Sequence, residues 1–188
     1  STSRGLGDVY KRQDYGGAEA NVAASLALLG DQVQYLTKLP ENSLGHTARN
    51  TIRGLGVDTQ KILWGGPRLG IYFFEKGASV RNTNVVYDRA GSSFATMKAD
   101  EFDWAVLLND INYFYFSGIT PAIGSEQQAA VFAACQYCSD HNITVICDMN
   151  FREKMWSPEA AQAFFKTVMP FIDVCIANDE DFEATLGI

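Results

Sequence analysis

The chain has 188 residues, of which 47% are hydrophobic, and this is enough to build one domain with a sizeable core. Its 22 acidic and 15 basic side chains give a formal net charge of −7 without a basic stripe, which argues against nucleic acid or an anionic membrane as a partner. No apolar run approaches the roughly 20 residues of a membrane span, and no secretory leader is recognisable, so we expect a cytoplasmic protein.

The two ends of the chain differ from the rest. Residues 1–13 read STSRGLGDVYKRQ and have neither helical nor strand periodicity, so we interpret them as a non-native leader. Residues 178–186 predict a short helix that stops at Gly187 without a following tail. We therefore expect residues 14–188 to be the N-terminal and central part of one domain that is truncated at both ends.

A helix is predicted over residues 18–29, directly after Gly16 and Gly17. Two glycines would allow positive φ angles and a close approach of the backbone to a ligand. The helix N-terminus that follows offers unpaired N–H groups with a partial positive charge. Asn21, one turn into the helix, can donate to and accept from sugar hydroxyls. The stretch predicts a polyol-binding turn, while a plain strand-to-helix turn is the alternative interpretation of the same spacing.

The next elements are short. Alternating side chains predict a strand over residues 33–38, and a helix is predicted over 43–55. Two strand-like runs, 69–76 and 82–88, flank the turn Gly77-Ala78-Ser79. Such runs on either side of a glycine-containing turn predict a β-hairpin.

Beyond residue 104, strands and helices alternate. The predicted strands are 111–116, 144–147 and 174–177, and the predicted helices are 125–140, 157–169 and 179–186. This alternation predicts right-handed βαβ units with a parallel sheet, which is an α/β fold.

Polar side chains follow each of these three strands, at the edge where parallel sheets bind ligands: residues 117–120, 148–152 and 178–181. Arg152, with Asp148 and Asn150 beside it, could bind an anion while a carboxylate keeps it oriented. Asn178 with Asp181 could hold hydrated magnesium. Each residue alone could equally be a loop cap or a turn residue, but their convergence on one edge favours a site.

The cysteines and histidines do not predict a site. Cys135 and Cys138 have redox or zinc spacing, but they lie within a predicted helix and have no second ligand pair nearby, so we expect packed, reduced thiols. His46 and His141 have no Cys, Asp or Glu partner at catalytic or metal spacing. Surface or cap positions are expected for both.

Four segments carry a family resemblance. They are residues 16–30, YDRAGS at 87–92, SGITP at 117–121, and DMNFR at 148–152 followed by WSP at 156–158. In this order they resemble the ribokinase-like (PfkB-type) sugar kinases, and most of all the branch that phosphorylates 2-keto-3-deoxygluconate. The resemblance implies a three-layer α/β/α fold with a parallel sheet and a small β-lid at about residues 68–90. It also implies transfer of the γ-phosphoryl group of ATP, with Mg²⁺, to a sugar hydroxyl.

The resemblance also implies roles for individual residues in binding a sugar acid. Gly17 and Asn21 would contact sugar hydroxyls, and Ile119 would line the pocket. Tyr72 and Tyr87 would come from the lid hairpin. Two cations, Arg89 and Arg152, would meet the sugar-acid carboxylate, with Arg152 also touching the transferring phosphate. A homodimer formed through the lid is implied as well.

Two departures from the family pattern matter. The family's Asn-x-x-Glu motif for magnesium and phosphate is present as Asn178-Asp179-Glu180-Asp181, with aspartate where glutamate is expected. The Gly-Ala-Gly-Asp element, which supplies the general base and the anion hole, is not found in the chain. We therefore expect the catalytic base and the nucleotide-binding part to lie outside this chain, and the chain alone to be inactive.

Other functions remain open from the sequence. The substrate could be a neutral sugar, as in a fructokinase or ribokinase type, or the chain could be a non-catalytic sugar-binding module. A Rossmann dehydrogenase is disfavoured because GGAEAN lacks the third glycine of that fingerprint, and no acidic residue ends the following strand.

Overall fold

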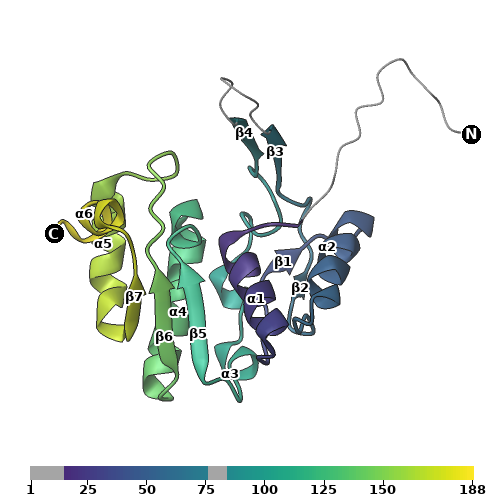
Figure 1. Cartoon of the computed structure of the whole chain (residues 1–188), viewed down its shortest axis with the longest axis horizontal. Coiled ribbons are helices and arrows are strands. Elements are labelled where there is room, and N and C mark those ends of the chain that lie inside the picture. The colour runs from purple at the N-terminus through teal and green to yellow at the C-terminus, as the bar shows by residue number, and fades with distance from the viewer. Residues whose placement is uncertain (1–14, 76–83) are drawn as a thin grey trace, which may run out of the picture.

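The computed structural model describes residues 15–75 and 84–188, so the predicted leader 1–13 and the predicted turn at 77–79 lie outside the described residues. The helices and strands, labelled in Figure 1, are α1 (Ala18–Leu29), β1 (Lys38–Leu39), α2 (Ser43–Gly54), β2 (Leu63–Trp64), β3 (Ile71–Glu75), β4 (Asn84–Asp88), α3 (Trp104–Leu107), β5 (Tyr113–Ser117), α4 (Ser125–Asp140), β6 (Thr144–Asp148), α5 (Pro158–Val168), β7 (Val174–Ile176) and α6 (Asp179–Leu186).

The centre of the molecule is a parallel sheet with the order β5-β6-β7. Helices α4 and α5 lie behind this sheet in Figure 1, while α1 lies on the other side, against β5. The main core fills the space between the sheet and α4 and α5, and its members include Phe116, Val145, Cys147, Cys135 and Phe165. The predicted βαβ alternation and the α/β fold class are confirmed.

The opposite face of the sheet is open beside β7. The side chains of Val145 and Cys147 on β6 are fully buried in this core. The residues before, between and after them on the strand face the other side of the sheet and are only half-buried. On β7, Val174 is 44% exposed and Ile176 is 52% exposed. Alternate burial along these strands follows from the two-residue period of a β-strand.

The predicted strand over residues 33–38 is wrong in its extent. Pairing along this segment is limited to one bridge at Gln34 and the short parallel strand β1. The ladder is interrupted because the partner segment makes a turn in which the Ile62 N–H bonds to the Thr59 carbonyl. Strands β1 and β2 and helices α1 and α2 together form the right-hand part of the molecule in Figure 1.

The predicted hairpin is confirmed as the antiparallel pair β3–β4, which we call the lid hairpin and which projects away from the body in Figure 1. At its base, the Arg68 guanidinium donates to both carboxylate oxygens of Asp88, at 2.8 and 2.6 Å. This planar pair lowers the pKa of the exposed Asp88 carboxyl and joins the chain before β3 to the end of β4.

Local signals set the ends of the helices. Helix α1 ends at Gly30, whose φ of 103° is available to glycine at little cost. Helix α5 starts as expected: the Ser157 side chain accepts from the Ala160 N–H, and Pro158 occupies the first helical position. His141 is the exposed C-cap of α4. Across residues 15–75 and 84–188, no helix is both long and apolar enough to cross a membrane.

The prediction of packed thiols is confirmed. Cys135 and Cys138 are fully buried and unpaired in α4. Burial raises the pKa of each thiol to about 12, so both stay protonated at neutral pH. They are part of the core behind the sheet.

Candidate functional site

The three polar segments predicted after the strands meet at one edge of the sheet. The register places Ser117 beside Asp148, and Asp148 beside Ile176. Backbone bonds join the segments beyond these positions: the Gly118 N–H donates to the Asp148 carbonyl at 2.8 Å, and the Met149 N–H to the Ile176 carbonyl at 2.8 Å. This edge, where residues 117–120, 148–152 and 178–181 converge, is the carboxyl edge, and it lies on the same side of the molecule as the lid hairpin in Figure 1.

Gly118 allows two of these segments to touch. A Cβ atom at this position would lie 2.0 Å from the carbonyl oxygen of Met149, which is too close for any side chain. The glycine is therefore needed because the backbone of the β5 loop packs directly on the backbone that follows β6. Ile119, the next residue, is half-buried.

Glu19, in the first turn of α1, connects the carboxyl edge to the segment Gly16-Gly17 before this helix, which we call the glycine turn. Its Oε1 atom accepts from the Ser117 N–H at 3.2 Å, the Ser117 hydroxyl at 2.7 Å and the Thr120 hydroxyl at 2.8 Å. Bonds to a carboxylate are stronger than bonds between neutral groups. One side chain thus fixes the N-terminus of α1 against the loop that carries Ile119.

The glycine turn itself differs from the prediction. Neither Gly16 nor Gly17 adopts the left-handed conformation that favours glycine; Gly17 is extended, with φ 164° and ψ 151°. Glycine at position 16 has a different physical reason, because a Cβ atom there would lie 2.6 Å from the Tyr72 hydroxyl. Tyr72 belongs to β3, so the lid hairpin approaches the glycine turn at this point.

Helix α1 begins without a side-chain cap, and Asn21 is exposed. The Asn21 N–H donates to the Gly17 carbonyl at 2.9 Å, which is the first bond of the helix. Within the described part of the chain, the Asn21 carboxamide makes no hydrogen bond, so it is free to donate to and accept from a ligand.

The lid hairpin holds a cation against two aromatic rings. Tyr72 and Tyr87 face each other across the hairpin with ring centroids 6.2 Å apart. The Arg89 guanidinium lies 4.3 Å from the centroid of the Tyr87 ring and 6.0 Å from that of the Tyr72 ring. Tyr87 and Arg89 are two residues apart and share one face of the hairpin, whereas Asp88 between them pairs with Arg68. The structure therefore brings together Gly16, Tyr72, Tyr87 and Arg89.

Arg152 is exposed at the carboxyl edge. Its Nη1 atom donates to the Phe151 carbonyl at 2.8 Å. The sequence predicted that a carboxylate, Asp148, would orient Arg152, but the described residues form no ion pair between the two. The backbone carbonyl of Phe151 orients the guanidinium instead. Its charge still acts on Asp148 at a distance, because it opposes part of the rise in the pKa of that carboxyl.

Several titratable groups lie close together at this edge. Burial and the nearby charge of Asp181 raise the pKa of the Asp148 carboxyl, against the lowering effects of the Asn150 N–H, Arg152 and the Tyr115 hydroxyl. Burial and the charge of Asp148 raise the pKa of Tyr115 well above its ordinary value. Tyr115 is therefore a neutral donor to Asp148 in the physiological range.

Asn178 and Asp181 both have structural partners. The Asn178 side chain accepts from the Asp181 N–H at 2.7 Å and caps α6. One oxygen of Asp181 accepts from the Phe151 N–H at 3.0 Å. Among the residues that the structure describes, no group of three or more His, Cys, Asp or Glu side chains could hold a metal ion. A direct all-protein metal site is thus not formed by these segments.

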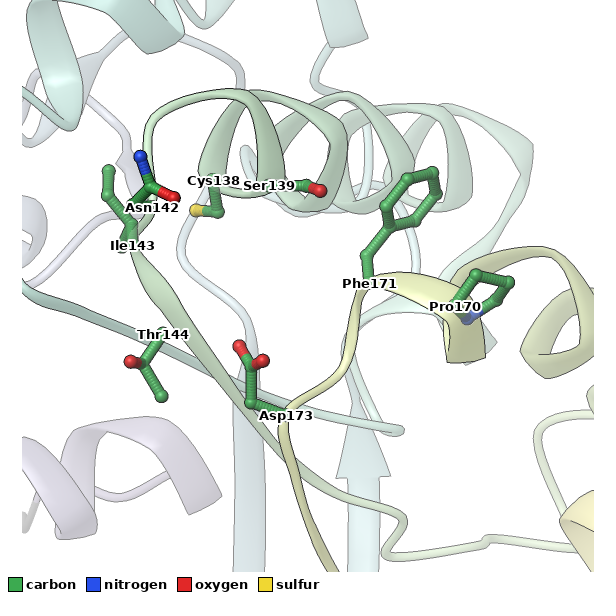
Figure 2. A pocket seen from close by; sticks show the side chains of 8 residues that line it. All are labelled: Cys138, Ser139, Asn142, Ile143, Thr144, Pro170, Phe171 and Asp173. Carbon is green, nitrogen blue, oxygen red and sulfur yellow. The ribbon is translucent and has the colours of Figure 1, made fainter.

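A hollow of about 280 Å³ lies at the other end of the sheet. Figure 2 shows its lining, which is Cys138, Ser139, Asn142, Ile143, Thr144, Pro170, Phe171 and Asp173. The Asp173 carboxylate already accepts from the Val145 N–H at 2.8 Å and so braces the loop before β7. This hollow opens at the amino ends of β6 and β7 and is separate from the carboxyl edge.

Sequence reasoning missed two residues of the site. Glu19 was visible only as an acid in the first turn of a helix, a position that acids commonly take for electrostatic reasons. Tyr115 lies in the middle of a hydrophobic strand, where the alternation of burial was the only available signal. Neither signal predicts a partner that is distant in the sequence.

Comparison with known proteins assigns the family. Residues 10–188 match the family described as pfkB family carbohydrate kinase, and the chain belongs to that family. The resemblance drawn from the four sequence segments is confirmed. A putative ribokinase II from E. coli shares 15% identity at a TM-score of 0.78 over 96% of this chain and 59% of that chain, which shows the ribokinase-like fold alone.

Proteins with higher sequence identity to this chain are named as kinases of sugar acids. The crystal structure of 2-dehydro-3-deoxygluconokinase from Thermotoga maritima shares 47% identity at a TM-score of 0.90, covering 93% of this chain and 54% of that one. A 2-dehydro-3-deoxygalactonokinase from Haloferax volcanii is 36% identical over 92% of this chain and 54% of that protein. A 5-dehydro-2-deoxygluconokinase from Clostridium tetani is 26% identical over 92% and 51%. The chain therefore spans about half the length of the relatives it matches.

Proposed function

We propose that the full-length protein containing this chain transfers the γ-phosphoryl group of ATP to a hydroxyl of a 2-keto-3-deoxy sugar acid, 2-keto-3-deoxygluconate. Membership of the carbohydrate kinase family supports the reaction type. The names of the relatives from Thermotoga maritima and Haloferax volcanii support a keto-deoxy sugar acid as the substrate class. This chain would supply mainly the sugar site.

The observation that carries the proposal is the position of Arg89. Its guanidinium lies over the Tyr87 and Tyr72 rings on the lid hairpin, and Tyr72 reaches the glycine turn at Gly16. Among the described residues, Arg89 forms no ion pair with a carboxylate of the chain. A sugar-acid carboxylate would complete this arrangement, because guanidinium and carboxylate form planar, charge-assisted pairs. A neutral sugar has no group that needs the charge.

The remaining residues have roles that follow from their chemistry. Gly17 and Asn21 would bind sugar hydroxyls at the N-terminus of α1, where the carboxamide can both donate and accept. Ile119 would give the pocket an apolar wall, held in place through Glu19. Arg152 would contact the carboxylate and the transferring phosphate from the carboxyl edge, where ligands of parallel sheets bind.

ATP and Mg²⁺ fit the described residues only in part. Asn178 and one oxygen of Asp181 already bond to backbone N–H groups, which leaves the second oxygen of Asp181 for a water-mediated contact. This suits hydrated Mg²⁺, which usually keeps several waters and takes few protein ligands. When bound, the metal neutralises charge on the phosphates of the nucleotide. The general base would lie outside residues 14–188.

A homodimer through the lid hairpin is a further part of the proposal. The face of the hairpin opposite to Tyr72 and Tyr87 carries Ile71 and Val86, which are 38% and 52% exposed. Exposed apolar residues on a projecting hairpin are suited to contact with a second copy. Light scattering of the full-length protein tests this, since Val86→Lys should lower the measured mass from dimer to monomer.

The reaction is tested by offering four substrates to the full-length protein with ATP: 2-keto-3-deoxygluconate, 2-keto-3-deoxygalactonate, fructose and ribose. ADP release and ³¹P NMR of the product measure the transfer. We expect phosphorylation of the two acids at much higher kcat/KM than of the neutral sugars. A preference for fructose or ribose would instead indicate a neutral-sugar kinase. Calorimetric binding of an acid without any turnover would indicate a non-catalytic binding module.

A further inference from the structure

We infer that the hollow between the C-terminal half of α2 and β2 is a second ligand site, which binds a small phosphate monoester that also carries hydroxyl groups. It is formed by residues 49–64 and contains none of the residues that converge at the carboxyl edge. Its volume of about 350 Å³ lies within the range of small-molecule sites. The lining residues are Arg49, Arg53, Val57, Asp58, Thr59, Gln60 and Trp64.

Two arginines give this site its charge. Arg49 and Arg53 are four residues apart on α2, so they are neighbours on one face of the helix, and both line the hollow. Like charges at this spacing destabilise a helix. In a chain with a net charge of −7, two neighbouring cations in one hollow are unusual, and a bound anion would reduce the repulsion between them.

Arg49 is held in position before any ligand binds. Its guanidinium lies 5.5 Å from the centroid of the Trp64 ring, and its Nη2 atom donates to the Asn50 side chain at 3.0 Å. His46 packs on the same tryptophan, with ring centroids 4.6 Å apart. A guanidinium that is already oriented loses less conformational entropy when it binds a ligand.

Arg53 has no such partner. It is exposed, and within the described part of the chain its side chain makes no hydrogen bond or ion pair. The nearby Lys61 is different, because its ammonium group donates to the carbonyls of Val106 and Leu107 at 3.0 Å each. The cation that remains available beside Arg49 is therefore a second guanidinium, and guanidinium groups match the oxygens of a phosphate.

The other polar groups of the hollow suit hydroxyls. Asp58 contributes a carboxylate of which one oxygen accepts from the Gln60 N–H at 2.9 Å, and its charge offsets one of the two arginines. Thr59 and the Gln60 carboxamide add groups that both donate and accept. Together, two arginines and one aspartate give the hollow one excess positive charge, next to groups that can bind hydroxyls. This composition fits a phosphate ester of a polyol or sugar better than an apolar or a cationic ligand.

The probe for a first test is glycerol 3-phosphate, titrated calorimetrically into the full-length protein that contains this chain. Neutral glycerol is the ligand control. Arg49→Gln and Arg53→Gln should each weaken the affinity about tenfold or more, because each removes a charge-assisted contact, and the double variant should lose more. Lys166→Gln removes one exposed positive charge from α5, away from the hollow, and should leave the affinity within about twofold.

Trp64 provides a second readout. Binding should change the tryptophan emission of the wild type, and this change should be lost in Trp64→Phe, in which Trp104 and Trp156 remain. Gln favours helices about as well as Arg, so the melting temperatures of the α2 variants should equal that of the wild type. Undetectable binding at about 10 mM glycerol 3-phosphate, or equal affinity of the wild type and the double variant, would overturn the assignment.

Discussion

Glu19 binds Ser117 through two hydrogen bonds to a single carboxylate oxygen, one from the Ser117 N–H at 3.2 Å and one from its hydroxyl at 2.7 Å. The two residues are 98 positions apart in the chain. The same oxygen accepts from the Thr120 hydroxyl. The N-terminus of α1 and the loop after β5 are therefore positioned relative to each other by one side chain.

Replacing Glu19 by alanine should destabilise the full-length protein by about 1–3 kcal/mol, because the fully buried Ser117 hydroxyl and the half-buried Thr120 hydroxyl lose their acceptor. Urea unfolding measures the change. Glu180→Ala is the matched control, since Glu180 also lies in the first turn of a helix but is exposed; it should change the free energy of unfolding by less than about 0.5 kcal/mol. Equal effects of the two substitutions would contradict a positioning role for Glu19.

Gly118→Ala should be strongly destabilising, by about 3 kcal/mol or more, because its Cβ atom would collide with the backbone carbonyl of Met149 and the backbone can move only with the sheet. The matched control is Gly54→Ala in α2, where a Cβ atom would meet nothing within 4 Å. Alanine favours the helix, so this control should be neutral or stabilising by up to about 1 kcal/mol. Thermal melting compares the two variants, and similar melting temperatures would mean that the β5 and β6 loops separate easily.

The sequence was informative where the physical signals are local. Ser157 and Pro158 predict the start of α5 because a cap and a fixed φ act within one helical turn. The three polar segments could be assigned to one edge because parallel strands place their carboxyl ends together. The extent of the strand over 33–38 could not be predicted, since it depends on a turn in the partner segment near Thr59.

For the candidate site, too, local features could be predicted from the sequence and contacts between distant elements could not. The Tyr87-Asp88-Arg89 segment correctly placed a cation on the hairpin, but its contact with Tyr72 depends on which residues face each other across the hairpin. The reason for glycine at position 16 could not be deduced from the local sequence, because the Tyr72 hydroxyl comes from another element. Partners that are distant in the sequence leave no local signal.

Gly16→Ala should weaken sugar binding more than it weakens the fold. The added Cβ atom would displace the Tyr72 hydroxyl, which is the end of a side chain on a projecting hairpin and can move. We expect a rise of about tenfold in KM for the sugar acid, equivalent to about 1.4 kcal/mol, with a melting temperature close to that of the wild type. Steady-state kinetics and melting of the full-length protein test this. An unchanged KM would mean that the contact between Tyr72 and the glycine turn plays no part in substrate binding.

Asp148 should make stability depend on pH. Burial and the charge of Asp181 raise the pKa of its carboxyl in the folded state, so the folded protein binds this proton more tightly than the unfolded chain does. The resulting stabilisation is fully present below the ordinary pKa of about 3.9 and is lost as the pH rises through the raised value. Asp148→Asn cannot ionise, so the variant should gain stability relative to the wild type between about pH 4 and neutrality.

Urea unfolding over that pH range measures the difference between Asp148→Asn and the wild type. The two free energies of unfolding should diverge as the pH rises, with the variant above the wild type at pH 7. The opposite order at pH 7 would show that attraction between Asp148 and Arg152 outweighs burial and the repulsion from Asp181.

The most direct test of the account is the kinetic effect of Arg89→Ala in the full-length protein. If Arg89 binds the carboxylate of a 2-keto-3-deoxy sugar acid, the lost charge-assisted contact is worth about 1.5–3 kcal/mol. KM for the acid should then rise about ten- to a hundredfold, while any activity on neutral ketoses or pentoses changes little. Lys166→Ala, which removes a distant exposed charge, serves as the control and should leave both activities unchanged. Equal losses on the acid and the neutral sugars would mean that Arg89 only supports the lid hairpin, and would contradict the assignment of a sugar acid as the substrate.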